Sequence, residues 1–193
     1  MLADTGSVAV GSEATVELGY TLNMRVLGVD CGSEYTGFGV VEEFETGQHR
    51  RLVCCASGAI RLKPRDPMAL KLQQIFSSLS AIIVEQQPRV VAIEDVFYAV
   101  NVKSALKLGQ VRGVAMLAAS SAGLAVSEYA PLAIKASVVG YGRAGKQQVQ
   151  HMVTRLLNLA EIPQPADAAD ALAIAICHLH TSATLARQSA AAR

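Results

Sequence analysis

The chain has 193 residues, of which 51% are hydrophobic and 17% charged, and its formal net charge is only +1. This length and composition predict one domain with an ordinary core. The longest apolar run, around 114–126, is interrupted by serines and is too short to span a membrane. The four cysteines show no Cys-x-x-Cys spacing, so neither a zinc site nor a disulfide framework is indicated. We expect a soluble, cytoplasmic protein.

The first 23 residues contain no Lys or Arg, so they lack the basic start of a secretory signal. They also show no clear hydrophobic period. We expect residues 1–23 to form a flexible extension before a single domain at 24–180. Because Met24 stands directly before the first apolar strand, we also hypothesise that the natural chain starts there.

The stretch 25–41 organises the chain that follows. An apolar strand ends in Asp30, and a second apolar strand begins near Phe38. Between them we expect Gly32 and Gly37 to turn the chain, because glycine tolerates positive φ. A third strand at 51–60 then closes an antiparallel meander.

Helices and short apolar strands alternate after this meander. Apolar residues recur at helical spacing in 66–87, where Asp66 and Pro67 are expected as N-cap and first helical residue. A buried strand at 90–93 is followed by Glu94 and Asp95. The remaining elements are helices at 101–122, from 131, at 147–159 and at 167–180, a strand at 125–129, a mobile basic loop at 140–146, and a tail at 181–193 expected to be flexible. This order predicts an α/β fold of the ribonuclease H-like type, a five-stranded mixed sheet flanked by α-helices.

Four acidic residues stand out as candidate ligands. Asp30 and Glu94 both end apolar strands, where ligands bind in open α/β sheets. Asp167 and Asp170 lie three apart on one predicted helix and therefore share a face. The alternative is that Asp30 caps a turn and Asp167 caps its helix. If all four meet, the site favours Mg²⁺ or Mn²⁺, and two such ions can activate a water and stabilise the leaving oxygen of a phosphodiester.

Basic residues are concentrated in the region 96–160, where Glu128 is the one acid and the formal charge is +6. The basic residues there are Lys103, Lys107, Arg112, Lys135, Arg143, Lys146 and Arg155. This asymmetry indicates a basic surface beside an acidic pocket, as an enzyme acting on a polyanion requires. The alternative is a solvated surface that binds no ligand.

From Met24 to about His180 the chain resembles the RuvC-type Holliday junction resolvases of bacteria. Four blocks carry the resemblance: Leu-Gly-Val-Asp-Cys-Gly-Ser-x-x-Thr-Gly-Phe-Gly-Val at 27–40, Ala-Ile-Glu-Asp-Val-Phe at 92–97, Asn-x-x-Ser-Ala-Leu-Lys-Leu-Gly-Gln-x-Arg-Gly at 101–113, and Asp-Ala-Ala-Asp-Ala-Leu-Ala at 167–173. The first block alone also occurs in sugar kinases and actin-like ATPases, whereas all four in this order are highly specific. One departure is Cys31, where the family usually has proline.

The resemblance implies a homodimeric, Mg²⁺-dependent endonuclease that nicks two opposing strands of a four-way DNA junction. The family's catalytic carboxylates fall on Asp30, Glu94, Asp167 and Asp170, with Glu94 rather than Asp95 in that role. Its basic DNA contacts match Lys135 and Lys146, and Phe97 matches an aromatic that stacks on junction bases. The alternative for Phe97 is an ordinary core residue. The RuvA and RuvB branch-migration proteins are implied as partners by the resemblance alone.

Two other functions fit parts of this sequence. A structure-selective DNA-binding protein would share the fold and basic surface but have an inert acidic pocket. An ATPase would use the stretch from Asp30 to Gly37 as a phosphate loop, although no second phosphate-binding glycine turn follows downstream. For the dimer we expect the helix 101–122 to form the contact surface.

Overall fold

A five-stranded mixed sheet in the order β3-β2-β1-β4-β5 forms the middle layer of the computed structural model, which describes residues 21–46, 49–95 and 101–191. β1 (Thr21–Asp30), β2 (Tyr35–Thr46) and β3 (His49–Arg61) form the antiparallel meander. β4 (Val90–Glu94) and β5 (Ala125–Tyr129) run parallel to β1. The predicted five-stranded mixed sheet is confirmed.

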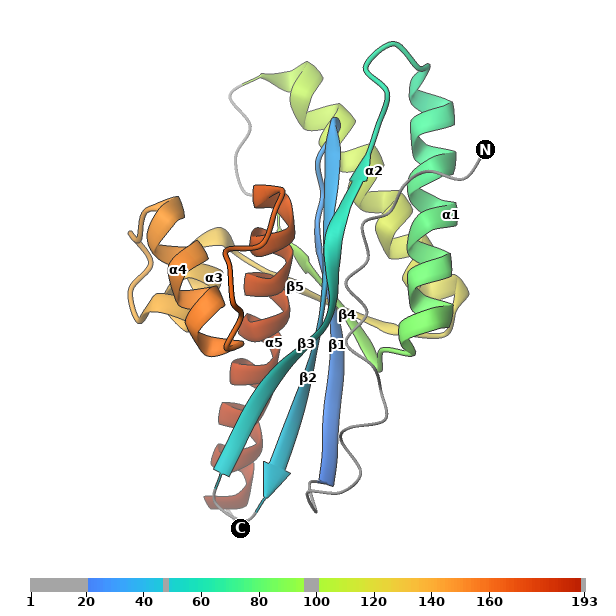
Figure 1. Cartoon of the computed structure of the whole chain (residues 1–193). Helices are drawn as coiled ribbons and strands as arrows, with labels where there is room; N and C mark the ends of the chain where they lie inside the picture. The colour runs from blue at the N-terminus through green and yellow to red at the C-terminus, as the bar shows by residue number, and fades with distance from the viewer. Residues whose placement is uncertain (1–20, 47–48, 96–100, 192–193) are drawn as a thin grey trace.

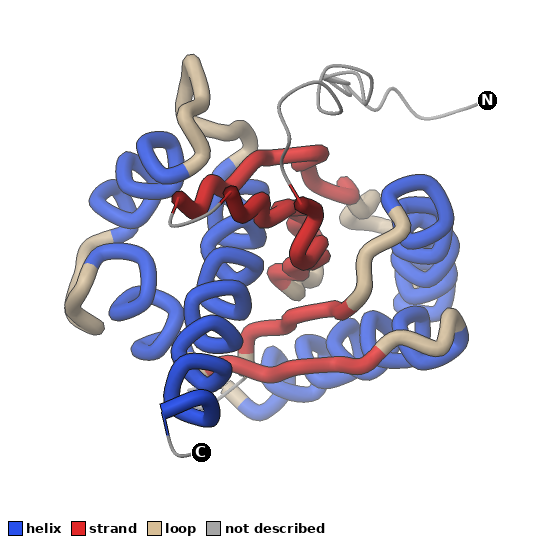
Figure 2. The backbone as a smooth tube through the Cα atoms, turned by 90° about the horizontal axis from the view of Figure 1, so that it is seen from below, coloured by secondary structure: helices blue, strands red, loops and turns tan. Residues whose placement is uncertain are grey.

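Helices cover both faces of this sheet (Figures 1 and 2). α1 (Met68–Gln86) and α2 (Val102–Ser121) lie on one side, which we call the α2 face. α3 (Pro131–Val139), α4 (Lys146–Leu156) and α5 (Ala166–Ala191) lie on the other, the α5 face. Each face therefore has its own apolar core.

Strand alternation decides which side chain enters which core. On β1, Val26 packs into the core on the α5 face, whereas Leu27 and Val29 pack into the core on the α2 face. Cys54 and Cys55 likewise divide between the two cores, as predicted for adjacent strand residues. By the same alternation, Asp30 at the end of β1 points to the α5 face.

α5 lies in direct backbone contact with β1 and β2, because those strands carry glycine where the helix crosses them. A Cβ atom on Gly28 would lie 2.1 Å from the carbonyl oxygen of Ala171, and one on Gly37 would lie 2.1 Å from that of Asp167. Gly37 is thus inside β2 and not in the turn. Neither Gly32 nor Gly37 has positive φ, so the predicted conformational reason for these glycines was wrong, and the reason is lack of space.

α5 is the core helix of the protein. From Ala168 to Leu179 it is almost entirely buried between the sheet and α3 with α4. By length and composition alone its segment Ala166–Ser189 could cross a membrane, but 61% of an apolar 18-residue stretch of this segment is buried inside the protein. Its apolar sequence is therefore explained by packing on two sides.

Several boundaries differ from the predictions. Residues 1–20 of the expected extension lie outside the described residues, but β1 already begins at Thr21. α5 continues to Ala191, well past the expected end at 180, in keeping with the high helix propensity of its alanines. Pro67, not Asp66, is the N-cap of α1 and has no side-chain capping bond, whereas Asn101 caps α2 as predicted.

Substituting Gly28 by alanine tests the close contact with α5. We expect Gly28→Ala to lower the free energy of unfolding by about 3 kcal/mol or more, because α5 must move to admit the Cβ atom. Gly145→Ala is the control, since that Cβ atom would lie 3.7 Å from Gln148 Oε1, and it should cost less than about 1 kcal/mol. Urea denaturation followed by circular dichroism measures both, and equal effects of the two substitutions would contradict the account.

Candidate active site

The carboxyl ends of β1 and β4 place the first two acids side by side. These strands are parallel neighbours in register, with Val29 opposite Ile93, so Asp30 and Glu94 follow at the same edge of the sheet. Both side chains point to the α5 face, because Ala92 two residues before Glu94 packs into that core. The predicted meeting of these two strand ends is confirmed.

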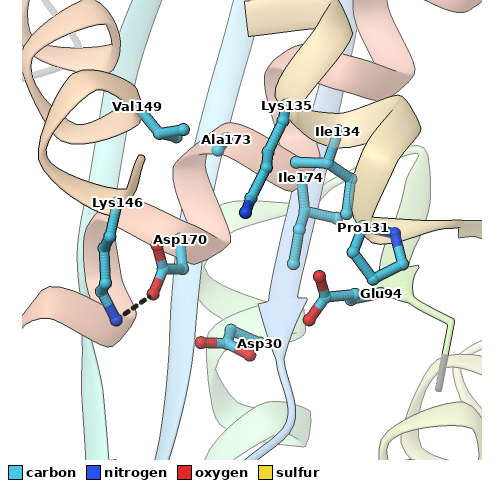
Figure 3. A pocket seen from close by; sticks show the side chains of 10 residues that line it. All are labelled: Asp30, Glu94, Pro131, Ile134, Lys135, Lys146, Val149, Asp170, Ala173 and Ile174. Carbon is cyan, nitrogen blue, oxygen red and sulfur yellow. Dashed lines mark ion pairs between the residues drawn. The ribbon is translucent and has the colours of Figure 1, made fainter. Parts of the chain in front are cut away.

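The first turns of α5 bring the other two acids to the same edge. Asp170 lines the cavity there, together with Asp30 and Glu94 (Figure 3). Asp167 does not line it, but its backbone lies against Gly37 and its charge acts on Asp30. The four predicted acids therefore gather at one end of the sheet, three of them around one cavity.

The cavity has a volume of about 190 Å³ and two basic residues on its wall. Lys135 comes from α3 and points toward the carboxylates (Figure 3), and Lys146 is the first residue of α4. Lys146 was predicted to lie in the 140–146 loop. Its Nζ lies 2.7 Å from Asp170 Oδ2. The rest of the wall is apolar and was not anticipated from the sequence: Pro131, Ile134, Val149, Ala173 and Ile174.

Burial and neighbouring carboxylates raise the pKa of both strand-end acids. Burial, together with the charges of Asp170, Glu94 and Asp167, raises the pKa of Asp30 to about 7, against the opposing charge of Lys146. Burial and Asp170 also raise the pKa of Glu94, against the opposing effect of Lys135 and Lys146. The pKa of Lys146 is raised by its bond to Asp170. The cavity therefore holds more negative charge than its lysines neutralise.

Divalent cations fit this donor set chemically. The oxygen ligands are hard, and the excess negative charge around Asp30 is what a cation would offset. Within the described part of the chain, however, no three His, Cys, Asp or Glu side chains are placed so that together they could hold an ion. The ammonium of Lys146 instead partners Asp170. To bind a divalent cation, the carboxylate side chains of the cavity would therefore have to rotate toward it.

The side chains of Glu94 and Asp95 lie on opposite faces of the sheet. Asp95 is turned away from the cavity and pairs with Arg112 of α2, at 3.3 Å between Oδ1 and Nη2. Arg112 also pairs with Glu128 of β5. Arg112 is thus held by two carboxylates on the α2 face, and its role as a DNA contact stays a prediction.

The other predicted DNA contacts differ in how far the structure describes them. Lys103 and Lys107 are exposed on the first turns of α2, and Arg143 is exposed before α4. Phe97 lies outside the described residues. The basic surface therefore has members on both α2 and the α3–α4 region.

Most of the chain is similar in sequence to one family of known proteins. A family model described as crossover junction endodeoxyribonuclease RuvC matches residues 26–178. A crossover junction endodeoxyribonuclease RuvC of Koribacter versatilis (strain Ellin345) is 65% identical over 169 residues, covering 88% of this chain and 100% of that protein. One of Geobacter sulfurreducens is 52% identical, covering 82% of this chain and 94% of that protein.

The fold of the chain is also similar to that of solved structures with the same name. A Thermus thermophilus RuvC structure matches with a TM-score of 0.76 and 31% identity, covering 83% of this chain and 96% of that one. A second structure, T. thermophilus RuvC in complex with Holliday junction substrate, matches with a TM-score of 0.74 and 28% identity over the same shares.

The raised pKa of Asp30 predicts an unusual dependence of stability on pH. Between about pH 4 and pH 7 the unfolded chain loses this proton while the folded protein keeps it, so stability should fall as pH rises. Asp30→Asn removes that penalty, and without divalent cations we expect it to stabilise the protein by about 3 kcal/mol at pH 8 and by little at pH 4.

Thermal and urea unfolding in the presence of a chelator measure this difference. Glu161→Gln, at an exposed position, is the control and should leave the pH profile unchanged. A destabilising effect of Asp30→Asn at pH 8 would show that the charge at this position is compensated in the folded protein.

Proposed function

Since the chain belongs to the RuvC family of crossover junction endodeoxyribonucleases, we propose that its carboxylate-lined cavity hydrolyses the backbone of four-way (Holliday) DNA junctions. The fold is ribonuclease H-like, as predicted. The observation that carries the proposal is the convergence of Asp30, Glu94 and Asp170 on one cavity with Lys135 and Lys146. Such junction resolution serves recombination and DNA repair, and we propose that it takes place in the cytoplasm.

The catalytic residues in this proposal are Asp30, Glu94, Asp167 and Asp170. Family nucleases depend on metal ions in general, and we assign Mg²⁺ to this site, two ions in each, with Mn²⁺ as a substitute. When bound, such ions activate a water and stabilise the leaving oxygen of a phosphodiester. The raised pKa of Asp30 supports the assignment, because a nearby cation favours the ionised carboxylate.

The lysines of the cavity complement the phosphate. Lys146 pairs with Asp170 in the ligand-free protein, and a phosphate oxygen can replace that carboxylate as its partner. Lys135 of α3 lines the same cavity. The proposed DNA surface extends from them to Arg143, Lys103 and Lys107, and also includes Phe97 as a base-stacking residue.

Paired nicks on opposing strands require two active sites, so we propose a homodimer formed through α2. Its outer face exposes Val102, Leu106 and Leu117, with side chains 75%, 65% and 56% accessible. Gly109 and Gly113 lie between the leucines, and a Cβ atom there would meet nothing within 4 Å. A second copy of α2 can therefore approach closely at this stripe. The RuvA–RuvB branch-migration complex remains a proposed partner without an assigned surface.

Removing one active-site charge tests the catalytic assignment. We expect Asp30→Asn and Glu94→Gln each to lower the rate of Mg²⁺-dependent junction cleavage by about 10³-fold or more, since each removes a ligand of the catalytic ions. Junction affinity in an electrophoretic mobility-shift assay should remain within about threefold, because basic residues supply most of it. Glu161→Gln is the control.

Mg²⁺-dependent cleavage retained by either variant would reject the catalytic role of that carboxylate. Binding of the junction without cleavage by the unmodified protein would favour the inert structure-selective binding protein instead. Nucleotide binding without nuclease activity would favour the ATPase.

Charges on the α2 stripe test the dimer. We expect Leu106→Glu with Leu117→Glu to convert a dimer into a monomer in sedimentation-velocity experiments, because like charges would face each other across the contact. Thermal stability at low concentration should change little, since both side chains are exposed. Val84→Glu, on the exposed surface of α1, is the control. A double variant that stays dimeric would place the contact elsewhere.

A further inference from the structure

Three charged groups meet on the α2 face, directly behind the acids of the active site. Ile93 pairs with Glu128 across β4 and β5, and Glu94 pairs with Tyr129. Because paired residues of parallel strands share a face, Glu128 lies on the α2 face with Ile93, and Asp95 follows two residues later on the same face. Arg112 of α2 contacts both carboxylates.

Asp95, the residue after Glu94, is held by two contacts, one from its backbone and one from its side chain. The Asp95 backbone N–H donates a hydrogen bond of 2.8 Å to the Tyr129 carbonyl oxygen, and its carboxylate pairs with Arg112. Tyr129 is held in turn from the α5 face, where its hydroxyl lies 2.9 Å from His178 Nδ1. The backbone immediately after Glu94 thus has little freedom to rotate.

The burial of these groups argues against a role in stability alone. The Arg112 side chain is only 18% exposed, and its buried Nε has no hydrogen-bond partner within the residues that the structure describes. Both carboxylates are 43% exposed, so water screens their attraction to the guanidinium. A partly desolvated, incompletely bonded arginine contributes little net stability. Its removal would leave two carboxylates facing each other at neighbouring strand ends.

We propose that Arg112 is a positioning residue for the active site: by holding Asp95 and Glu128 together it fixes the end of β4, so that Glu94 stays directed into the cavity. Its charge also reaches Cys31, the residue after Asp30, where it opposes the rise in the thiol pKa. The inference rests on the proposed function of that cavity.

The test compares Arg112→Met with Arg112→Lys, Asp95→Asn and the double variant Arg112→Met with Asp95→Asn. We expect Arg112→Met to lower the cleavage rate at saturating junction about 10- to 100-fold, as a misplacement of about 1 Å does. Junction affinity should stay within about threefold. Arg112→Lys should recover most of the rate, and the double variant should be no worse than Arg112→Met. Arg155→Met, an exposed arginine on α4, is the control.

A second readout does not require cleavage. The Mg²⁺ concentration that gives half of the maximal rise in melting temperature should increase about tenfold in Arg112→Met and not in Arg155→Met. A parallel loss of junction affinity and rate would make Arg112 a DNA contact and overturn the proposal. An unchanged rate and Mg²⁺ response with a lower melting temperature would make it purely structural.

The two hypotheses fail in different ways. If the unmodified protein does not cleave junctions, the proposed function is rejected, while the Mg²⁺ response still tests Arg112. If Arg112→Met does not fold, Asp95→Asn tests the same contact, because it removes the charge that pairs with Arg112. We then expect a lower rate and a weaker Mg²⁺ response in Asp95→Asn, and normal values of both would reject the proposal.

Discussion

The contact between the backbone of α5 and two glycine-bearing strands is the constraint on which the site depends. No side chain separates α5 from β1 at Gly28 or from β2 at Gly37 and Gly39. The helix therefore crosses the sheet at the shortest possible distance, and its first turn ends at the strand edge. Asp167 and Asp170 reach Asp30 only because of this approach, so packing and chemistry are specified by the same residues.

Gathering carboxylates in this way has an electrostatic cost that the protein only partly offsets. Burial and mutual repulsion raise the pKa of Asp30 to about 7, and the ammonium of Lys146 neutralises one neighbour. A cluster of this kind lowers the stability of the ligand-free protein, which is common at functional sites. The same excess charge is what a bound cation would offset.

Much of the fold and site could be predicted from sequence because the signals are local. Apolar strands ending in Asp30 and Glu94, and two acids three apart on a helix, marked the four acids as candidates, and the family resemblance selected Glu94 over Asp95. Other features depend on contacts between distant segments. Gly37 was expected in a turn, but it leaves room for the backbone of α5, a helix that begins more than a hundred residues later. The ion pairs of Arg112 were not anticipated either, because its partners Asp95 and Glu128 lie on other elements.

The choice between Glu94 and Asp95 also illustrates this limit. Both residues stand at the end of the same apolar strand, and strand alternation sends their side chains to opposite faces of the sheet. Which face holds the cavity is known only from the structure, which shows the helices packed on each face. The α5 face receives Glu94 and the cavity, and the α2 face receives Asp95 and its arginine. At the end of β4, Glu94 therefore lines the cavity on one face of the sheet, and Asp95 pairs with Arg112 on the other.

The proposed chemistry requires carboxylates from β1, β4 and α5 to bind divalent cations together in this cavity. Anomalous X-ray scattering from crystals grown with Mn²⁺ tests it most directly. We expect Mn²⁺ peaks about 2.1 Å from carboxylate oxygens of Asp30, Glu94 and Asp170. Saturating Mn²⁺ bound only elsewhere on the protein, with these three side chains unliganded, would contradict it.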